Sequence, residues 1–226
     1  MRFLEVAVFN YVSVVAVKEA GADRIEVCGN YGYGGLTPSA DFVRKTRELE
    51  GICVFVMIRQ RADNFIYSKN DIEKMMKDME MFKEMGVDGF VFGALDGNRR
   101  VEKTIAKEFI TMANPLPVTF HRAFDICDNL DKAAEDIIEC GFKRILTSGG
   151  EKNAFDGMFL IRDLILKYGN DIIIMPGGGI RKNNVMEIEN VTKAKEFHTA
   201  GLRKIFDSNE PVIIAGDIAE IKKAQT

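Results

Sequence analysis

Short apolar runs rich in β-branched residues alternate along the chain with longer segments in which apolar residues recur every three or four positions. Runs of the first kind are typical of buried strands, and segments of the second kind are typical of amphipathic helices. The strands predicted in this way lie at 3–9, 24–28, 52–59, 89–94, 116–122, 144–148, 171–177 and 195–200. The pattern therefore predicts an α/β fold built from successive βα units.

Two of the intervening segments show the helical period most clearly. Apolar residues at spacings of three and four predict helices over 71–85 and 153–167. The apolar face of the second helix would consist of Phe155, Phe159, Leu160, Leu164 and Leu166. Gly21, Gly86 and Gly141 each stand between a helical segment and the next strand. A glycine at that place predicts a helix that ends in the left-handed conformation.

The number of strands decides between two α/β architectures. Eight strands in 226 residues leave about 28 residues for each βα unit, and the fold that uses eight such units is the TIM barrel. A doubly wound open sheet is the alternative, but its first βα turn would be expected to carry GxGxxG, which the sequence lacks. We therefore predict one α/β domain over residues 1–226, a (β/α)8 TIM barrel with parallel inner strands.

Composition excludes some classes of partner. The chain has 31 basic and 34 acidic residues, for a net charge of -3, and no basic cluster with interleaved aromatic residues, so we expect no nucleic-acid partner. The apolar N-terminal run contains Glu5, and no stretch of about 18 apolar residues follows, so no membrane partner is expected. Four cysteines without CxxC spacing suit a reducing cytoplasm, the predicted location. A homodimer is left open.

Charged and titratable residues gather at the ends of the predicted strands, where a TIM barrel builds its active site. The candidate catalytic residues, which would share one mouth, are Glu5, Glu26, Arg59, His121 and His198. Together they would provide carboxylates, a fixed cation and two imidazoles for acid–base chemistry on an anionic ligand. The alternative interpretation is a set of buried ion pairs without chemistry.

The stretch PVTFHRAFD, residues 117–125, contains one of the two histidines. Side chains alternate along a strand, so Val118 and Phe120 would pack outward while His121 faces the barrel interior. By the same alternation Arg122 would turn toward the helices and pair there with Asp125. We therefore predict that His121 belongs to the site and that Arg122 and Asp125 anchor the loop.

Two glycine-rich turns, TSGG and PGGGI, follow the sixth and seventh predicted strands. Backbone N–H groups in such turns can bind an anion, and late loops of TIM barrels frequently hold phosphate. The candidate anion-binding residues are Ser148, Gly149, Gly150, Gly177, Gly178, Gly179 and Arg181. The alternative interpretation is that these glycines only turn the chain.

Several blocks of the sequence together resemble the CutC copper-homeostasis family. They are GADRIEVC with GGLTPS at 34–39, VFVMIRQR at 54–61, GVDGFVFGALDG at 86–97, LPVTFHRAFD at 116–125, RILTSGG at 144–150, IIIMPGGGI at 172–180 and EFH at 196–198. The resemblance implies a cytoplasmic TIM barrel concerned with copper, and copper(I) bound by cysteines near the ends of the first two strands. Cys28 is the second of these cysteines, and Ala7 stands where the first is expected.

Two functional hypotheses follow. The first is a copper-homeostasis protein that binds copper(I), as the resemblance implies, although copper(I) prefers at least two soft ligands and Cys28 supplies one. The second is an enzyme, an isomerase, lyase or hydrolase, that acts on a small anionic metabolite, phosphorylated metabolites included. A divalent metal held by the two histidines and a carboxylate is a further alternative. The expected ligand is thus a copper ion or a small anion.

Overall fold

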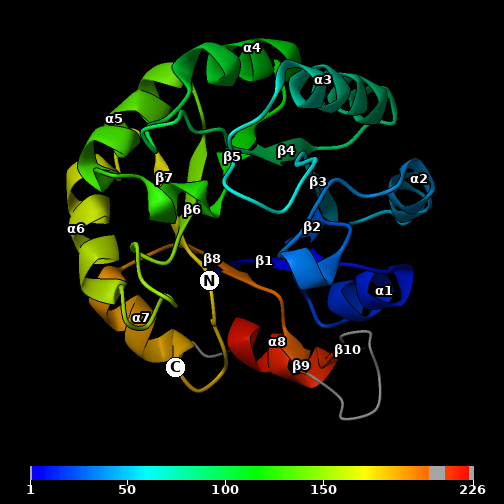
Figure 1. Ribbon diagram of the computed structural model, residues 1–226. Coiled ribbons are helices and arrows are strands. Elements are labelled where there is room, and N and C mark those ends of the chain that lie inside the picture. Colours follow the sequence, from blue (N-terminus) through cyan, green and yellow to red (C-terminus); the bar gives the residue numbers. More distant parts are fainter. Residues whose placement is uncertain (1, 204–211, 224–226) are drawn as a thin grey trace.

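The computed structural model describes residues 2–203 and 212–223, and it shows a ring of parallel strands surrounded by helices (Figure 1). The strands are β1 (Phe3–Val8), β2 (Arg24–Val27), β3 (Cys53–Met57), β4 (Gly89–Phe92), β5 (Val118–Phe120), β6 (Arg144–Thr147), β7 (Ile173–Pro176) and β8 (Glu196–Thr199). From β1 to β7 each strand pairs in parallel with the next one in the chain, and β1 also pairs in parallel with β8. The ends of this ladder, β7 and β8, contact each other and nearly close the barrel. The predicted TIM barrel is confirmed.

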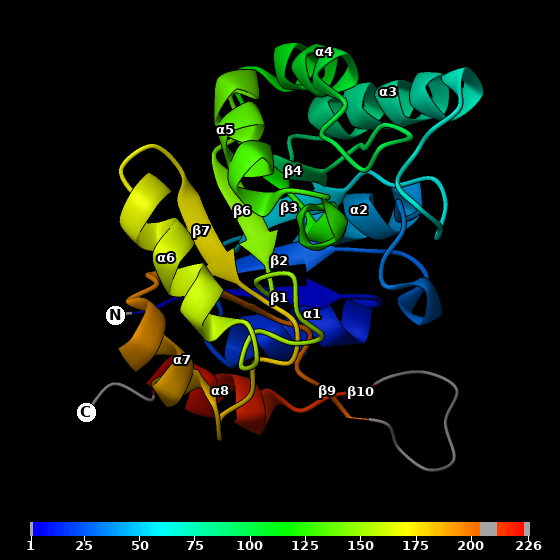
Figure 2. The same ribbon diagram turned by 60° about the vertical axis from the view of Figure 1, so that its left-hand side comes forward.

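Helices cover the outside of the ring of strands. They are α1 (Tyr11–Glu19), α2 (Ala40–Arg47), α3 (Lys69–Glu84), α4 (Lys103–Ala113), α5 (Leu130–Cys140), α6 (Met158–Tyr168), α7 (Val185–Thr192) and α8 (Ala215–Lys223). Single turns of 3-10 helix, η1 (Tyr31–Tyr33) and η2 (Arg122–Ile126), and a short antiparallel pair, β9 (Leu202–Arg203) with β10 (Val212–Ile213), complete the described elements (Figure 2). Across residues 2–203 and 212–223, every helix is too short or too polar to cross a membrane.

Local sequence signals fix the helix ends. The side chain of Ser68 accepts a hydrogen bond from the backbone N–H of Asp71, and Asp71 accepts one in return from the backbone N–H of Ser68, which starts α3 with a capping box. After α1, α3 and α5 the chain turns at Gly21, Gly86 and Gly141, whose φ angles are +85°, +76° and +96°. The predicted glycine ends of these helices are therefore confirmed.

The predicted helix over 153–167 is wrong in its start and in its buried face. Asn153 accepts hydrogen bonds from the backbone N–H groups of Phe155 and Asp156, so this stretch forms a turn and α6 begins only at Met158. The buried residues of α6 are Met158, Ile161, Leu164 and Tyr168. Of the predicted face only Leu164 is buried, because the face of α6 that packs against the barrel carries Met158, Ile161 and Tyr168 instead.

An ion network fills the barrel interior near the N-terminal ends of β2 and β8. Arg24 is almost fully buried and pairs with Glu5 and, at 2.8 Å, with Glu196. Its guanidinium lies between the rings of Phe3 and Phe55, 4.6 and 4.7 Å from their centroids. The rings thus hold Arg24, and Arg24 holds Glu5 by charge pairing. The C-terminal ends of the strands remain for the site.

Candidate active site at the mouth of the barrel

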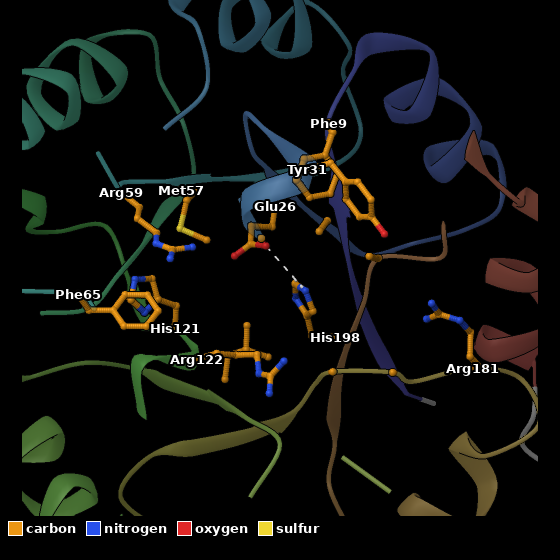
Figure 3. A pocket seen from close by; sticks show the side chains of 16 residues that line it. Phe9, Glu26, Tyr31, Met57, Arg59, Phe65, His121, Arg122, Arg181 and His198 are labelled. Carbon is orange, nitrogen blue, oxygen red and sulfur yellow. Dashed lines mark ion pairs between the residues drawn. The ribbon is translucent and has the colours of Figure 1, made fainter. Parts of the chain in front are cut away.

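A cavity of about 220 Å³ lies at the C-terminal ends of the strands (Figure 3). Four of the five candidate catalytic residues line it, namely Glu26, Arg59, His121 and His198. The fifth, Glu5, is fully buried and touches His198 from behind the cavity wall. Aromatic side chains that the sequence did not point to complete the wall: Phe9, Tyr31 and Phe65.

Glu5 orients His198. These residues stand opposite each other on the paired strands β1 and β8, and Nδ1 of His198 lies 2.7 Å from Oε1 of Glu5. Burial opposes ionisation of Glu5, but Arg24 and His198 outweigh burial and lower the pKa of Glu5 to about 2. Glu5 is therefore a permanent anion that accepts the Nδ1 proton and leaves Nε2 of His198 directed toward the cavity.

Glu26 is a buried carboxyl group with an unsatisfied oxygen. Its Oε2 accepts a weak hydrogen bond from the thiol of Cys28 at 3.5 Å and lies 3.8 Å from Nε2 of His198. Its Oε1 has no hydrogen-bond partner in the described part of the chain. Burial is the largest influence on this group and raises the pKa of Glu26 to about 7. A carboxyl group that titrates near neutral pH suits general acid–base work.

The pKa of the His198 imidazole, which lies beside Glu26, is also shifted. Burial by itself would lower the pKa of His198, but the carboxylates of Glu26 and Glu5 outweigh burial and raise it above its ordinary value. Glu26 and His198 therefore form a pair whose titrations are linked.

Arg59 brings a positive charge into the cavity and forms no ion pair with a carboxylate of the described residues, although Asp63 lies near enough to favour its charged form. Its Nη1 donates to the carbonyl oxygens of Tyr33 and Gly35, each at 3.1 Å, and its guanidinium lies 4.5 Å from the ring centroid of Phe65. Only 7% of Arg59 is exposed, and its Nε has no hydrogen-bond partner within residues 2–203 and 212–223. A buried guanidinium in this condition favours binding of an anion.

His121 presents a single hydrogen-bond donor. Its Nδ1 accepts the backbone N–H of Ala123 at 3.2 Å, so the proton of the neutral ring is on Nε2. Burial and the charge of Arg59 lower the pKa of His121 to about 3, which keeps the ring neutral. A Cβ atom on Gly93 would lie 2.7 Å from the ring, so the absence of a side chain at Gly93 makes room for the imidazole.

The expected orientation of Arg122 is wrong. Arg122 lines the cavity instead of turning toward the helices, because β5 ends at Phe120 and the chain enters η2 at Arg122 itself, where strand alternation no longer applies. Its pair with Asp125 is present, with Nε 2.8 Å from Oδ2. Its Nη2 also donates to the hydroxyl of Ser148 at 2.6 Å.

The TSGG turn does not offer its N–H groups to a ligand, contrary to the expectation for Ser148, Gly149 and Gly150. The carboxylate of Asp125 accepts the backbone N–H groups of Ser148 and Gly150, at 3.0 and 3.2 Å. The N–H of Gly149 donates to the hydroxyl of Thr147 at 2.8 Å. An internal carboxylate therefore occupies the place that we expected an external anion to take.

The glycines of the PGGGI turn differ in their contacts. The N–H of Gly177 donates to the carbonyl oxygen of Thr147 at 2.8 Å and belongs to the fold. Gly178 and Gly179 line the cavity, with φ angles of +91° and +77°, and Arg181 lies beside them on the wall. Of the seven expected anion-binding residues, these last three face the same space as Arg59.

The residues present do not fit a copper(I) site with two thiolates. Cys28 is 1% exposed, and burial together with Glu26 raises its pKa well above the ordinary value. Ala7 lines the cavity at the position of the first expected thiol, the one on β1. The other cysteines lie elsewhere, Cys53 at the start of β3, Cys127 after η2 and Cys140 at the end of α5. Copper(I) would therefore meet one protonated, buried thiol, with the thioether of Met57 packed beside it, instead of two thiolates.

A divalent cation would find three possible ligands in the barrel, one of which is already bound to other residues. One ligand atom from each of Glu5, Glu26 and His198 lies within 4.8 Å of the others. Glu5 already binds Arg24 and His198, so Glu26 and Nε2 of His198 remain as the available donors. Two donors are fewer than a divalent cation usually takes from a protein site.

A family model described as CutC family matches residues 2–203. The human protein named copper homeostasis protein cutC homolog is 42% identical over 195 residues, which cover 86% of this chain and 71% of the human protein. The protein of the same name from Drosophila melanogaster is 39% identical over 202 residues, which cover 88% of this chain and 77% of the fly protein.

Among solved structures, a crystal structure of CutC from Streptococcus agalactiae superposes with a TM-score of 0.84 at 29% sequence identity. The match covers 88% of this chain and 99% of the streptococcal chain. The fold and most of the chain's length are therefore shared with that protein.

Proposed function

This chain belongs to the CutC family, and we propose that it is an enzyme that holds a small anionic metabolite in the barrel cavity and acts on it by general acid–base chemistry. One observation carries the proposal. A buried guanidinium that forms no ion pair with a carboxylate of the described residues and has an unsatisfied Nε, Arg59, lines the same cavity as a buried carboxyl with an unsatisfied oxygen, Glu26. Leaving both unsatisfied costs free energy that a ligand with complementary groups would recover.

The division of labour follows from the charges. Arg59 holds the anionic part of the ligand, since its charge is fixed at every relevant pH. Glu26 accepts or donates a proton at the reacting atom, and Glu5 keeps His198 in the tautomer and orientation that support Glu26. The cavity is smaller than the range of about 300 to 1,000 Å³ typical of drug-sized ligands, which favours a small metabolite.

Substitution of Arg59 tests the proposal. We expect the wild-type protein to bind at least one anion from a panel of oxalate, malonate, citrate and inorganic phosphate, and Arg59→Met to weaken that binding by about tenfold or more through loss of a charge-assisted hydrogen bond. Titration calorimetry measures the affinities. Arg59→Lys should fall between the two, because it keeps the charge but not the planar fork.

The matched control is Arg44→Met, which changes an exposed arginine on α2 that pairs with Asp41. Its affinities should equal those of the wild type. Wild-type protein that binds none of the four anions, or Arg59→Met that binds as tightly as the wild type, would rule out the proposal.

Copper(I) binding is the second candidate, favoured by the position of Cys28 and by the names of the human and fly relatives. We expect binding to be weak or substoichiometric, because a single protonated thiol stands where the resemblance implies two cysteines. Competition against a coloured copper(I) chelator measures it, with Cys140→Ser as the matched control. Tight binding of one copper per chain that disappears in Cys28→Ser would show that copper is the ligand.

A further inference from the structure

We propose that the reaction at this site begins with removal of a proton from a carbon next to a carbonyl group, with the carbonyl oxygen held by His121 and Arg59 and the proton taken by Glu26. The inference rests on the proposed function and adds to it the class of substrate, a carbonyl compound with an acidic C–H bond. Three features of the cavity carry it, one for each of these residues.

His121 supplies a donor that the fold does not use. The side chain is 3% exposed, its Nδ1 is occupied by the N–H of Ala123, and its Nε2 has no partner in the described residues. Buried polar groups are almost always hydrogen-bonded, and an exception at a cavity wall points to a ligand atom. The His121 side chain lines the cavity (Figure 3), while its Nε2 is almost inaccessible to solvent, so a matching acceptor such as a carbonyl oxygen would have to press close against the ring.

Arg59 lies at the same corner of the cavity as His121. Both contact the ring of Phe65, Arg59 at 4.5 Å and His121 at 4.9 Å from the ring centroid (Figure 3). One oxygen in this corner would meet an N–H of a neutral imidazole and a guanidinium. Two donors directed at one oxygen stabilise negative charge that develops there.

Glu26 provides the base. Its unsatisfied Oε1 belongs to a carboxyl that faces His198, Glu5 and Cys28, with Arg24 deeper in the barrel. In the step, the C–H bond breaks and the proton forms a bond to a carboxylate oxygen of Glu26. The electron pair of the C–H bond becomes the C=C bond of an enolate, and the carbonyl π pair moves onto the oxygen.

The neutral state of His121 matters for this chemistry. A neutral imidazole donates a hydrogen bond to the enolate oxygen without delivering a second positive charge to the cavity, and a carboxylate base paired with a neutral imidazole donor is a known arrangement for enolisation. The charge of the enolate is then balanced by Arg59, and Glu26 becomes neutral as the enolate forms.

Oxalate, whose planar dianion imitates the enolate of a 2-oxoacid, is the probe. Titration calorimetry of the intact protein at pH 8, in two buffers of different ionisation enthalpy, gives both the affinity and the protons taken up. We expect the wild type to bind oxalate and to take up about one proton, because the second negative charge forces protonation of Glu26. Glu26→Gln should bind oxalate without proton uptake.

The His121 variants separate its donor role from its structural role. His121→Asn keeps an acceptor for the N–H of Ala123 but loses Nε2–H, and we expect it to bind oxalate about tenfold to hundredfold more weakly with proton uptake intact. His121→Gln, whose amide reaches further, should recover part of the affinity. Unchanged melting temperatures would show that the variants fold.

The outcomes distinguish the inference from the proposed function. Oxalate binding that depends on Arg59 but not on His121, or that takes up no proton, would overturn the enolate assignment and leave the anion-binding enzyme standing. Binding of another anion of the panel without any binding of oxalate would do the same. Exchange of the methyl hydrogens of pyruvate for deuterium in heavy water, catalysed by the wild type and lost in Glu26→Gln, would support the assignment directly.

Discussion

Arg24→Met should lower the free energy of unfolding by about 3 to 5 kcal/mol, as removal of one partner from a buried ion pair does. Arg24 is 1% exposed and is shared between Glu5 and Glu196. Methionine fills similar space between Phe3 and Phe55 but leaves Glu5 without its main counter-ion. Urea unfolding monitored by circular dichroism measures the loss.

The loss of unfolding free energy in Arg24→Met should depend on pH in a defined direction. In the wild type Glu5 has a pKa of about 2, below its ordinary value of 4.5, so it contributes stability that is complete above about pH 4.5 and fades as the pH falls toward 2. Without Arg24 the pKa of Glu5 rises. As the pH falls, protonation of Glu5 removes its unpaired buried charge, so the variant loses less stability. The difference between variant and wild type should therefore be largest at pH 7 and smaller at pH 4.

Arg44→Met is the control for this experiment too, since Arg44 and Asp41 are both exposed and such pairs contribute about 0 to 1 kcal/mol. A loss below about 1 kcal/mol in Arg24→Met, or a loss that does not change between pH 7 and pH 4, would contradict the role assigned to the buried network.

The fold was predictable from the sequence because each βα unit carries its own local signal. Eight strand runs alternate with helical segments, and glycines mark the ends of α1, α3 and α5; no tertiary information is needed to count them. Helix α6 shows the limit of this reasoning. The backbone N–H groups of Phe155 and Asp156 donate to the side chain of Asn153 and start a turn inside an apolar run. Periodicity alone does not predict such a turn.

Part of the site was also predictable. The rule that barrel chemistry lies at strand ends selected Glu26, Arg59, His121 and His198, all of which line the cavity. Arg24 was missed, although it stands two residues before Glu26 on the same face of β2, a signal that strand alternation provides.

What the sequence could not show is which donors and acceptors satisfy one another. Whether the Nε of Arg59 and the Nε2 of His121 find a partner among the described residues depends on segments distant in the chain. The TSGG turn makes the same point, since its glycines suggest an anion site whether the anion comes from solvent or from the chain itself. The contacts of Asp125 decide that question.

Asp125→Ala should lower the melting temperature by about 6 to 12 °C, the equivalent of about 3 kcal/mol for a domain of this size. The carboxylate of Asp125 is nearly buried and accepts the backbone N–H groups of Ser148 and Gly150 and the Nε–H of Arg122. Removing it leaves these donors without a partner in a turn shaped to hold an anion.

That empty turn makes a second result expected, because a small carboxylate from solution can replace the missing side chain. Formate at 0.1 M should raise the melting temperature of Asp125→Ala by about 2 °C or more relative to chloride, as a ligand that binds only the folded state does, and should leave the wild type unchanged. Asp163→Ala, which removes an exposed carboxylate from α6, should respond to neither change. If Asp125→Ala melts within about 2 °C of the wild type, or if formate has no effect on it, then the turn does not depend on an anion, and its glycines serve only to reverse the chain.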